Sequence, residues 1–266
     1  MEYIDIKKVL TIAGSDSSGG AGIQADIKSI MANGCYAMSA ITSLTAQNTN
    51  GVFDILDIPV DFFIHQLNAC FEDIFPDAVK IGMVSNSNII RAISERISFY
   101  KAKNVVVDPV MVSTSGSRLV SEDAIDDLFN YLICKATIVT PNIPEAEILS
   151  DMHITDKNDM IKAAQIIYDK IEGACLLKGG HNINDANDLL IYDDKLVWIK
   201  GRRIDNPNTH GTGCTLSSAI ASNLAKGYDI EQSVVNAKEY ISNALSHAIN
   251  LGAGSGPLNH GWKYFV

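Results

Sequence analysis

The order of apolar runs and amphipathic segments predicts an α/β protein, a three-layer α/β/α sandwich around a mostly parallel sheet. Short runs rich in Val, Ile and Leu, too uniformly apolar for strands with a wet face, alternate with segments that repeat apolar residues at helical spacing. No linker, repeat or low-complexity tract interrupts this alternation over 266 residues. Hydrophobic residues make up 47% of the chain, enough for a full core. We therefore expect one domain over residues 1–266.

The strands are expected in apolar runs that end at glycine or polar residues. A first buried strand at 9–13 runs into a glycine-rich loop at 14–22, and a second is expected at 35–44. The alternating stretch 52–58 is typical of an edge strand or a flap. Later strands are expected at 78–83, 105–111, 136–141 and 174–181, followed by a hairpin of 188–192 with 196–200.

Helices are expected between these strands, where apolar residues recur at a spacing of three to four. Ser121 is suited to cap the helix 121–132, and Pro144 to an early helical position in the short helix from 142. The last helix, 230–251, repeats apolar residues with a 3.6 period. The other expected helices are 23–30, 59–74, 88–100, 157–171 and 212–226.

The net charge and the composition limit the kinds of partner that this protein can bind. The chain has 21 Lys and Arg against 31 Asp and Glu, a net charge of −10, so we expect neither nucleic-acid nor membrane binding. A small phosphorylated ligand remains compatible with that charge. The five cysteines form no CxxC pair, which predicts reduced thiols and no zinc site. Without a signal peptide or a membrane-length apolar run, we expect a cytoplasmic protein.

The stretch 208–215, Asn-Thr-His-Gly-Thr-Gly-Cys-Thr, predicts a glycine turn that opens a helix. Unpaired N–H groups and the positive end of the helix dipole make such a turn an anion site. Cys214 falls in the first helical turn, where the pKa of a thiol drops below its ordinary value of about 8.5. An anion cradle with an activatable base suits phosphoryl transfer to a hydroxyl. The alternative is a buried cysteine in a glycine-capped turn.

The loop 14–22 follows a strand and precedes a helix, the layout of a ligand loop. Gly14 and Gly19 resemble a P-loop in spacing, but Gly20-Ala21 stands where that motif requires Lys-Ser/Thr. The GxGxxG pattern of dinucleotide-binding proteins is also missing. We favour a substrate loop over a purely structural turn, because Asp16 and Asp26 lie in or just after it.

Polar residues follow several of the other strands. The amide of Gln47 can read a donor and an acceptor on a heterocycle edge. Asn142 and Glu145, three apart, together with Asp108 could hold hydrated Mg²⁺ against phosphate oxygens. For each of these residues a plain turn or helix cap is the alternative. Because ligands in open α/β sheets bind beyond the carboxyl ends of the strands, their shared position favours a ligand site. Lys178 lies at another such end, and the polar stretch 112–117 could form a lid.

Taken together, these stretches resemble the vitamin-kinase branch of the ribokinase-like superfamily, and most closely the hydroxymethylpyrimidine/phosphomethylpyrimidine kinases of thiamine synthesis. The resemblance runs from about residue 7 to the C-terminus. It is carried by the motifs at 14–26, 46–49, 80–83, 108–112, 140–145, 177–181 and 211–214.

The resemblance implies a ribokinase-like fold, often a homodimer with a small flap, and ATP with Mg²⁺ as cofactors; a monovalent cation is left open. The implied reaction transfers the ATP γ-phosphoryl group to a hydroxymethylpyrimidine and then to its monophosphate. Cys214 is the implied base, with an anion hole at Gly211, Thr212 and Gly213. The implied pyrimidine pocket comprises Gly14, Asp26, Gln47, Met83 and Val110. On the nucleotide side the resemblance implies Asp108, Asn142, Lys178, Gly179 and Thr209, with Glu145, Asn142 and Asp108 near the metal.

The chain departs from the family pattern at two places. Ser17 stands where the family commonly has proline, and Ser113-Thr114-Ser115-Gly116 replaces Ala-Lys-Ser-Gly. The lost lysine removes a cation from the lid. Some pyridoxal kinases of this branch carry a second cysteine in the lid, and Val112-Ser113 has none, which weighs against pyridoxal as the main substrate.

Three other functions compete with this reading. Pyridoxal or pyridoxine kinase needs the same site, and the two ring systems are alike in size. A non-catalytic sensor is disfavoured by the presence of Gly211, Gly213 and Cys214. A nicotinamide dehydrogenase is disfavoured by the missing GxGxxG pattern.

Overall fold

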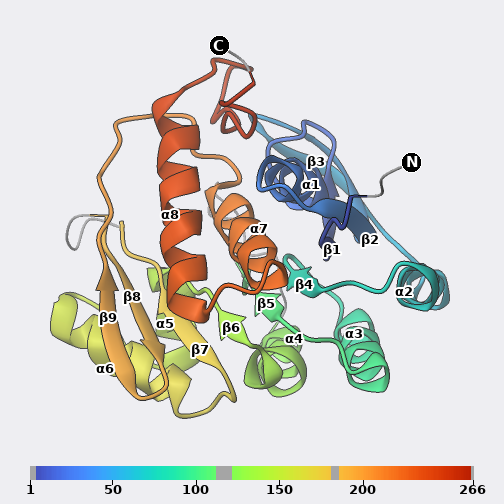
Figure 1. Ribbon diagram of the computed structural model, residues 1–266, viewed down its shortest axis with the longest axis horizontal. Helices are drawn as coiled ribbons and strands as arrows, with labels where there is room; N and C mark the ends of the chain where they lie inside the picture. The colour runs from blue at the N-terminus through green and yellow to red at the C-terminus, as the bar shows by residue number, and fades with distance from the viewer. Residues whose placement is uncertain (1–3, 112–121, 181–185, 265–266) are drawn as a thin grey trace.

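One nine-stranded sheet forms the middle of the molecule (Figure 1). The structure, a computed structural model, describes residues 4–111, 122–180 and 186–264. The strand order is β3-β2-β1-β4-β5-β6-β7-β8-β9. Strands β2, β1, β4, β5, β6 and β7 run parallel, and β3, β8 and β9 are added antiparallel at the two edges. The strands are β1 Lys8–Asp16, β2 Tyr36–Asn48, β3 Gly51–Asp57, β4 Ala78–Ile81, β5 Val105–Val107, β6 Ile138–Val139, β7 Ala174–Leu177, β8 Asp188–Tyr192 and β9 Lys195–Ile199.

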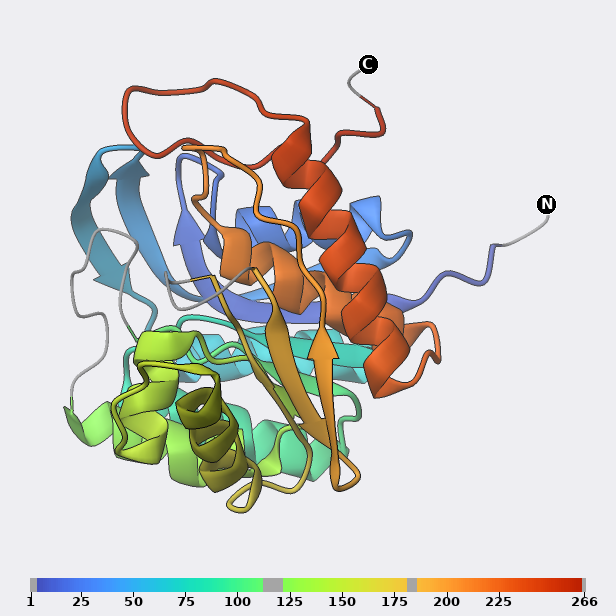
Figure 2. The same ribbon diagram turned by 90° about the vertical axis from the view of Figure 1, so that its left-hand side faces the viewer.

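Helices cover both faces of the sheet (Figure 2). One face packs against α1 Gly22–Ala32, α7 Thr212–Ala225 and α8 Ile230–Ser246. The other packs against α2 Val60–Asp73, α3 Ser87–Tyr100, α4 Glu122–Asp127, α5 Ile143–Ser150 and α6 Lys157–Tyr168. A π-helical turn, Leu128–Leu132, and a 3₁₀ turn, Ile133–Lys135, continue α4. The predicted α/β/α sandwich with a mostly parallel sheet is confirmed.

The central strands are apolar throughout because both of their faces are buried. In β1, Leu10 and Ile12 belong to the core under α2 and α3, whereas Val9 belongs to the core under α7 and α8. A strand with two buried faces reads as a continuous apolar run. Among the described residues, no helix is both long and apolar enough to cross a bilayer.

Several element boundaries differ from those expected. Strand β1 continues to Asp16, so the turn proper spans 17–21. Strand β2 runs through Gln47, because its end pairs with β3 as a hairpin. Strands β5 and β6 have only three and two residues, and α8 ends at Ser246. The expected lid at 112–117 and the cap at Ser121 lie outside the described residues.

The β2–β3 hairpin extends beyond the rest of the sheet and confirms the expected edge strand. Its outer strand is exposed, with Phe53 at 69%, Ile55 at 51% and Leu56 at 64% of their full accessibility. The segment after α8, red in Figure 2, passes beside the tip of this hairpin, where the amide of Gly254 donates to Thr49 Oγ1 at 3.1 Å.

A buried ion pair joins one of the two helical layers to the sheet. Lys80, in the middle of β4, is fully buried, and its Nζ lies 2.9 Å from both carboxylate oxygens of Asp26 in α1. The same carboxylate accepts hydrogen bonds from Thr11 of β1 at 2.6 Å and from Ser218 of α7 at 2.8 Å. Although burial lowers the pKa of Lys80, Asp26 raises it above its ordinary value. Strands β1 and β4 and helices α1 and α7 therefore share one charged contact.

We predict that Asp26→Ala destabilises the protein by about 3–5 kcal/mol, because it leaves the ammonium of Lys80 buried without a counter-charge. Urea unfolding at neutral pH measures the loss. The double variant Asp26→Leu/Lys80→Met should lose less, since no unpaired charge then remains inside. The matched control is Lys162→Met, which removes an exposed ion pair with Asp159 and should cost less than about 1 kcal/mol. Equal losses in the Asp26→Ala variant and the control would contradict the prediction.

Candidate active site

The site begins at the N-terminus of α7. Gly211 precedes the helix with φ 81°, a left-handed conformation that suits glycine. A Cβ on Gly211 would lie 1.9 Å from the carbonyl oxygen of Gly20, so only glycine permits the glycine-rich loop after β1 to pack against this turn. Two segments almost 200 residues apart are thereby brought into contact.

The first turn of α7 leaves backbone donors for an anion. The N–H of Thr215 makes the first helical hydrogen bond, to Gly211 O, and that of Thr212 turns back to Thr209 O at 3.2 Å. Among the described residues, the N–H groups of Gly213 and Cys214 have no such partner. They lie at the positive end of the helix dipole, the arrangement that binds phosphate oxygens.

The thiol of Cys214 does not have the lowered pKa expected from its helical position. Burial, together with the carboxylates of Asp26 and Asp108, raises the pKa of the thiol to about 11, although Lys80 lowers it. Desolvation therefore outweighs the effect of the nearby ammonium on this pKa. In the free protein at neutral pH this group is a neutral thiol.

A second ion pair lies beside the same helical turn. Lys178 Nζ, just past β7, is 2.8 Å from Asp108 Oδ1, just past β5. Although burial raises the pKa of Asp108, Lys178 and Lys80 hold it below its ordinary value, so this carboxylate is charged. A Cβ on Gly213 would lie 3.1 Å from Asp108 Oδ2 and 3.4 Å from Lys178 Nζ. The structure thus brings together Asp108, Lys178 and the α7 turn.

Asn142 and Glu145 form a capping box at the start of α5. Asn142 Oδ1 accepts from the N–H of Glu145 at 2.9 Å, and Glu145 Oε2 accepts from the N–H of Asn142 at 2.8 Å. Unlike the solvated glutamate of an ordinary cap, Glu145 is only 3% exposed, and burial raises its pKa to about 7. Asp108 also raises this pKa, whereas Lys178 lowers it, so the three charges face one another.

The carboxylates of Asp108 and Glu145 suit Mg²⁺ that also binds phosphate and water. They do not suit a metal held by protein side chains alone. Asp108 and Glu145 supply carboxylate oxygens at neighbouring strand ends, the ligands that Mg²⁺ takes when substrate phosphates and water complete its shell. Among the described residues, no group of three or more His, Cys, Asp and Glu side chains could hold a metal by itself.

The loop after β1 is organised by the carboxylate of Asp16. Its oxygens accept from the amide and hydroxyl of Ser18 at 2.8 and 2.7 Å, and from the amides of Gly20 and Ala21 at 3.0 and 2.8 Å. Nε2 of His210, in the turn before α7, lies 2.9 Å away. Asp16 therefore holds its own loop together and ties it to the anion site.

Three of the expected pocket residues, Gly14, Met83 and Gln47, gather near this loop. Gly14 is buried in β1, and a Cβ there would lie 2.7 Å from Met83 Cε. Gln47 lies 3.3 Å from His210, measured between their Nε2 atoms. Val110 follows Asp108, whose carbonyl oxygen accepts from its N–H at 2.8 Å.

Two expected site residues, Asp26 and Gly179, make structural contacts within the protein. Asp26 is fully buried, and both of its oxygens are occupied by Lys80, Thr11 and Ser218, so it does not line a pocket. Gly179 donates its N–H to Asp188 and would meet the carbonyl oxygen of Asn187 at 1.9 Å if it carried a Cβ. Thr209 is exposed, and its carbonyl oxygen accepts from Thr212; within the described part of the chain its side chain makes no hydrogen bond.

Sequence reasoning missed the roles of His210 and Lys80. A signal for Lys80 was present, because a lysine inside the apolar strand Ala78–Ile81 must be paired with a buried acid. His210 gave no comparable signal, since its partner lies 194 residues away.

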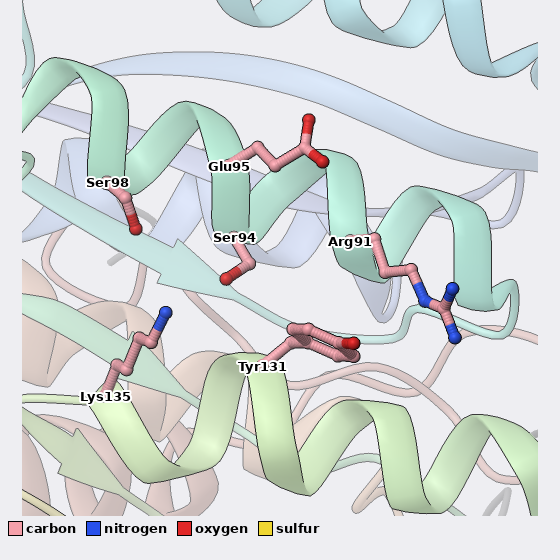
Figure 3. Close-up of a pocket in the computed structure, with 6 residues that line it drawn as sticks. All are labelled: Arg91, Ser94, Glu95, Ser98, Tyr131 and Lys135. Carbon is pink, nitrogen blue, oxygen red and sulfur yellow. The ribbon is translucent and has the colours of Figure 1, made fainter.

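A separate groove of about 450 Å³ lies between α3 and the turns that continue α4 (Figure 3). None of its residues belongs to the cluster described above. It is lined by Arg91, Ser94, Glu95, Ser98, Tyr131 and Lys135.

Comparisons with known proteins agree with the family that the sequence motifs resemble. The family model for phosphomethylpyrimidine kinase matches residues 16–259. A hydroxymethylpyrimidine/phosphomethylpyrimidine kinase of Haemophilus influenzae is 41% identical over 265 residues, 98% of each chain. The crystal structure of phosphomethylpyrimidine kinase from Clostridium difficile 630 has 47% identity and a TM-score of 0.81, covering 90% of this chain and 99% of that one.

A pyridoxal kinase is also similar in structure. The ADP complex of the Bacillus subtilis enzyme has a TM-score of 0.90 at 35% identity, covering 97% of this chain and 99% of that one. The fold is therefore that of the ribokinase-like vitamin kinases, and the chain belongs to the phosphomethylpyrimidine kinase family.

Proposed function

We propose that this protein transfers the γ-phosphoryl group of ATP to 4-amino-5-hydroxymethyl-2-methylpyrimidine, and then phosphorylates the monophosphate, in thiamine biosynthesis. One observation carries the proposal: the free N–H groups of α7, Cys214 and the Lys178–Asp108 pair converge at the carboxyl ends of the strands. The family match over residues 16–259 supports the substrate class. The five free cysteines fit a reducing compartment, and we place the protein in the cytoplasm.

The proposed roles follow from position. The anion site at Gly211, Thr212 and Gly213 receives the transferring phosphoryl group, with Gly213 supplying a free N–H. Lys178 neutralises charge on the nucleotide side, and Asp108 with Glu145 holds Mg²⁺ at the phosphates, Asn142 positioning Glu145 through the capping box. When bound, Mg²⁺ neutralises charge on the phosphates. Gln47, Gly14, Met83 and Val110 line the pyrimidine side.

Cys214 is proposed as the base that takes the proton of the substrate hydroxyl. Phosphoryl transfer through a loose transition state needs little help from a base until the alcohol oxygen bonds to phosphorus. Because burial raises the pKa of this thiol to about 11, only a small fraction is thiolate near neutral pH. That fraction rises as the pH approaches the pKa.

The first experiment compares three acceptors side by side: hydroxymethylpyrimidine, its monophosphate and pyridoxal, with ATP and Mg²⁺ and with products resolved by mass. We expect both pyrimidines to be converted and pyridoxal to react slowly. Pyridoxal is included because a pyridoxal kinase reaches a TM-score of 0.90. Turnover of pyridoxal alone would overturn the assignment to thiamine synthesis. Parallel assays in potassium and sodium buffers test for a monovalent cation, and omission of Mg²⁺ should abolish turnover.

We expect Cys214→Ala to lower kcat by about 10²–10⁴-fold, the usual contribution of a positioned base, while the pyrimidine still binds. In the unaltered protein kcat/KM should rise between about pH 7 and pH 9, because a group with a raised pKa is deprotonated only at alkaline pH. The variant should lack this rise. Cys134→Ala, which removes a thiol at the end of the α4 extension, is the control. Identical pH profiles in the two variants would rule out Cys214 as the base.

We expect Glu145→Gln to raise the Mg²⁺ concentration needed for half-maximal rate about tenfold, because one anionic ligand is lost while the amide can still accept the capping hydrogen bond. Titration of Mg²⁺ at saturating ATP measures the effect. Glu172→Gln, an exposed carboxylate, is the matched control. An unchanged Mg²⁺ dependence in Glu145→Gln would remove Glu145 from the metal site.

We further propose that two copies associate through the β2–β3 hairpin. Its outer strand exposes Val52, Phe53, Ile55 and Leu56, and an exposed apolar edge strand is a natural pairing surface. Light scattering should give twice the 28.8 kDa chain mass. The variant Phe53→Asp/Leu56→Asp should be monomeric. A monomeric unaltered protein would refute the dimer without bearing on the kinase assignment.

A further inference from the structure

The imidazole of His210 lies between two polar side chains from different segments. Its Nε2 is 2.9 Å from Asp16 Oδ2, and 3.3 Å from Nε2 of Gln47. At the other end of the same amide, Gln47 Oε1 lies 3.1 Å from the hydroxyl of Thr45. The hydrogen atoms of His210 and Thr45 determine whether Oε1 or Nε2 of Gln47 lies beside each of them.

The hydrogen between His210 and Asp16 belongs to His210. Asp16 is 2% exposed and accepts four further hydrogen bonds from Ser18, Gly20 and Ala21. Although burial raises the pKa of Asp16, these bonds and His210 hold it well below its ordinary range, so it is a carboxylate without a hydrogen. Nε2 of His210 must then carry the hydrogen, whether the ring is neutral or charged. That single hydrogen points to Asp16, and a protonated ring nitrogen has no lone pair, so toward Gln47 it can only share its hydrogen with an acceptor in a three-centre bond.

The hydroxyl hydrogen of Thr45 is also already used in a hydrogen bond, to Ser15. Thr45 Oγ1 lies 2.7 Å from the carbonyl oxygen of Ser15. A carbonyl has no hydrogen, so the single hydroxyl hydrogen lies on that line. Toward Gln47, the hydroxyl of Thr45 can only accept.

We propose that Asp16 and His210 are positioning residues that fix the orientation of the Gln47 amide, with Oε1 toward His210 and Nε2 toward Thr45. The two ends of an amide have nearly the same shape, so the partners decide which end is oxygen. Both partners of Gln47 require this orientation: His210 can share with Gln47 the hydrogen that it donates to Asp16 but has no lone pair there, and Thr45 offers a lone pair.

The backbone of Gln47 is fixed as well. Ser17 Oγ lies 2.8 Å from both the N–H and the carbonyl oxygen of Gln47. With backbone and amide both held, one N–H and one lone pair of the amide remain for a ligand. This pattern fits a heteroaromatic edge on which a ring nitrogen acceptor stands next to an amino donor. Resting on the proposed function, this makes Asp16 and His210 determinants of substrate specificity that need not touch the substrate.

A double-mutant cycle tests whether His210 acts through Gln47. We expect His210→Ala to raise KM for hydroxymethylpyrimidine about tenfold, the loss of roughly one hydrogen bond, with KM for ATP unchanged. In the Gln47→Ala background the same substitution should leave the pyrimidine KM unchanged. A merely structural role would instead give the same factor in both backgrounds and would overturn the proposal. Asp16→Asn, whose amide can offer a hydrogen to His210, is the second variant should His210→Ala fail to fold, and His153→Ala is the control.

The orientation itself can be measured in the free protein. With selectively labelled glutamine, nuclear Overhauser contacts from the side-chain amide protons of Gln47 should be stronger to Thr45 than to the His210 ring. The reverse order would overturn the proposal. This measurement needs no substrate, so it is independent of the kinase assignment. Absence of any pyrimidine turnover in the unaltered protein would refute the proposed function instead.

Discussion

The ion pair of Lys80 and Asp26 is the contact on which the site depends. It is fully buried under the N-terminal half of α7, and it joins β1, β4, α1 and α7 through Thr11 and Ser218. Ser218 lies one helical turn after Cys214, so the pair sets how the reactive end of α7 rests on the sheet. Burying two charges is costly unless their geometry and hydrogen bonds are complete, and here every oxygen of the carboxylate is used. The benefit of such a pair is one defined position for the helix.

A layer of charge surrounds that helix end. Lys80 lies beneath it and Lys178 beside it, each paired with an aspartate, while Glu145 faces Lys178 with its pKa raised to about 7. The cations are thus held in place before any anion arrives, and the same turn carries the N–H groups of Gly213 and Cys214, which have no backbone partner among the described residues. Phosphoryl transfer requires positioned charge more than covalent chemistry. A neutral thiol in this setting keeps the site from holding a surplus of negative charge in the absence of substrate.

Much of this was predictable from local pattern. The glycine turn before α7, the strand ends at Asp108 and Lys178, and the Asn142–Glu145 cap are all signalled by residues close together in sequence. Asp26 and Gly179 show contacts that local reasoning could not foresee. Both lie in motifs that resemble the family's. Asp26, however, pairs with a lysine 54 residues away, and the backbone of Asn187 packs against Gly179 where a side chain would otherwise lie. The prediction of a lowered pKa for the Cys214 thiol was wrong for a related reason. The position of Cys214 in the helix is visible in the sequence, whereas its burial by other segments is not.

The sequence by itself determined the α/β class, the order of the elements and the chemistry available at each strand end, since apolar periodicity and glycine placement are local properties. Only the tertiary structure decided which of those groups meet. His210 reaches Asp16 across 194 residues, and the proposed orientation of the Gln47 amide depends on His210, 163 residues away, as well as on Thr45 of the same strand. Such contacts depend on how crossovers bring strands side by side. A hydrogen bond has no preferred separation along the chain, so no local pattern announces it.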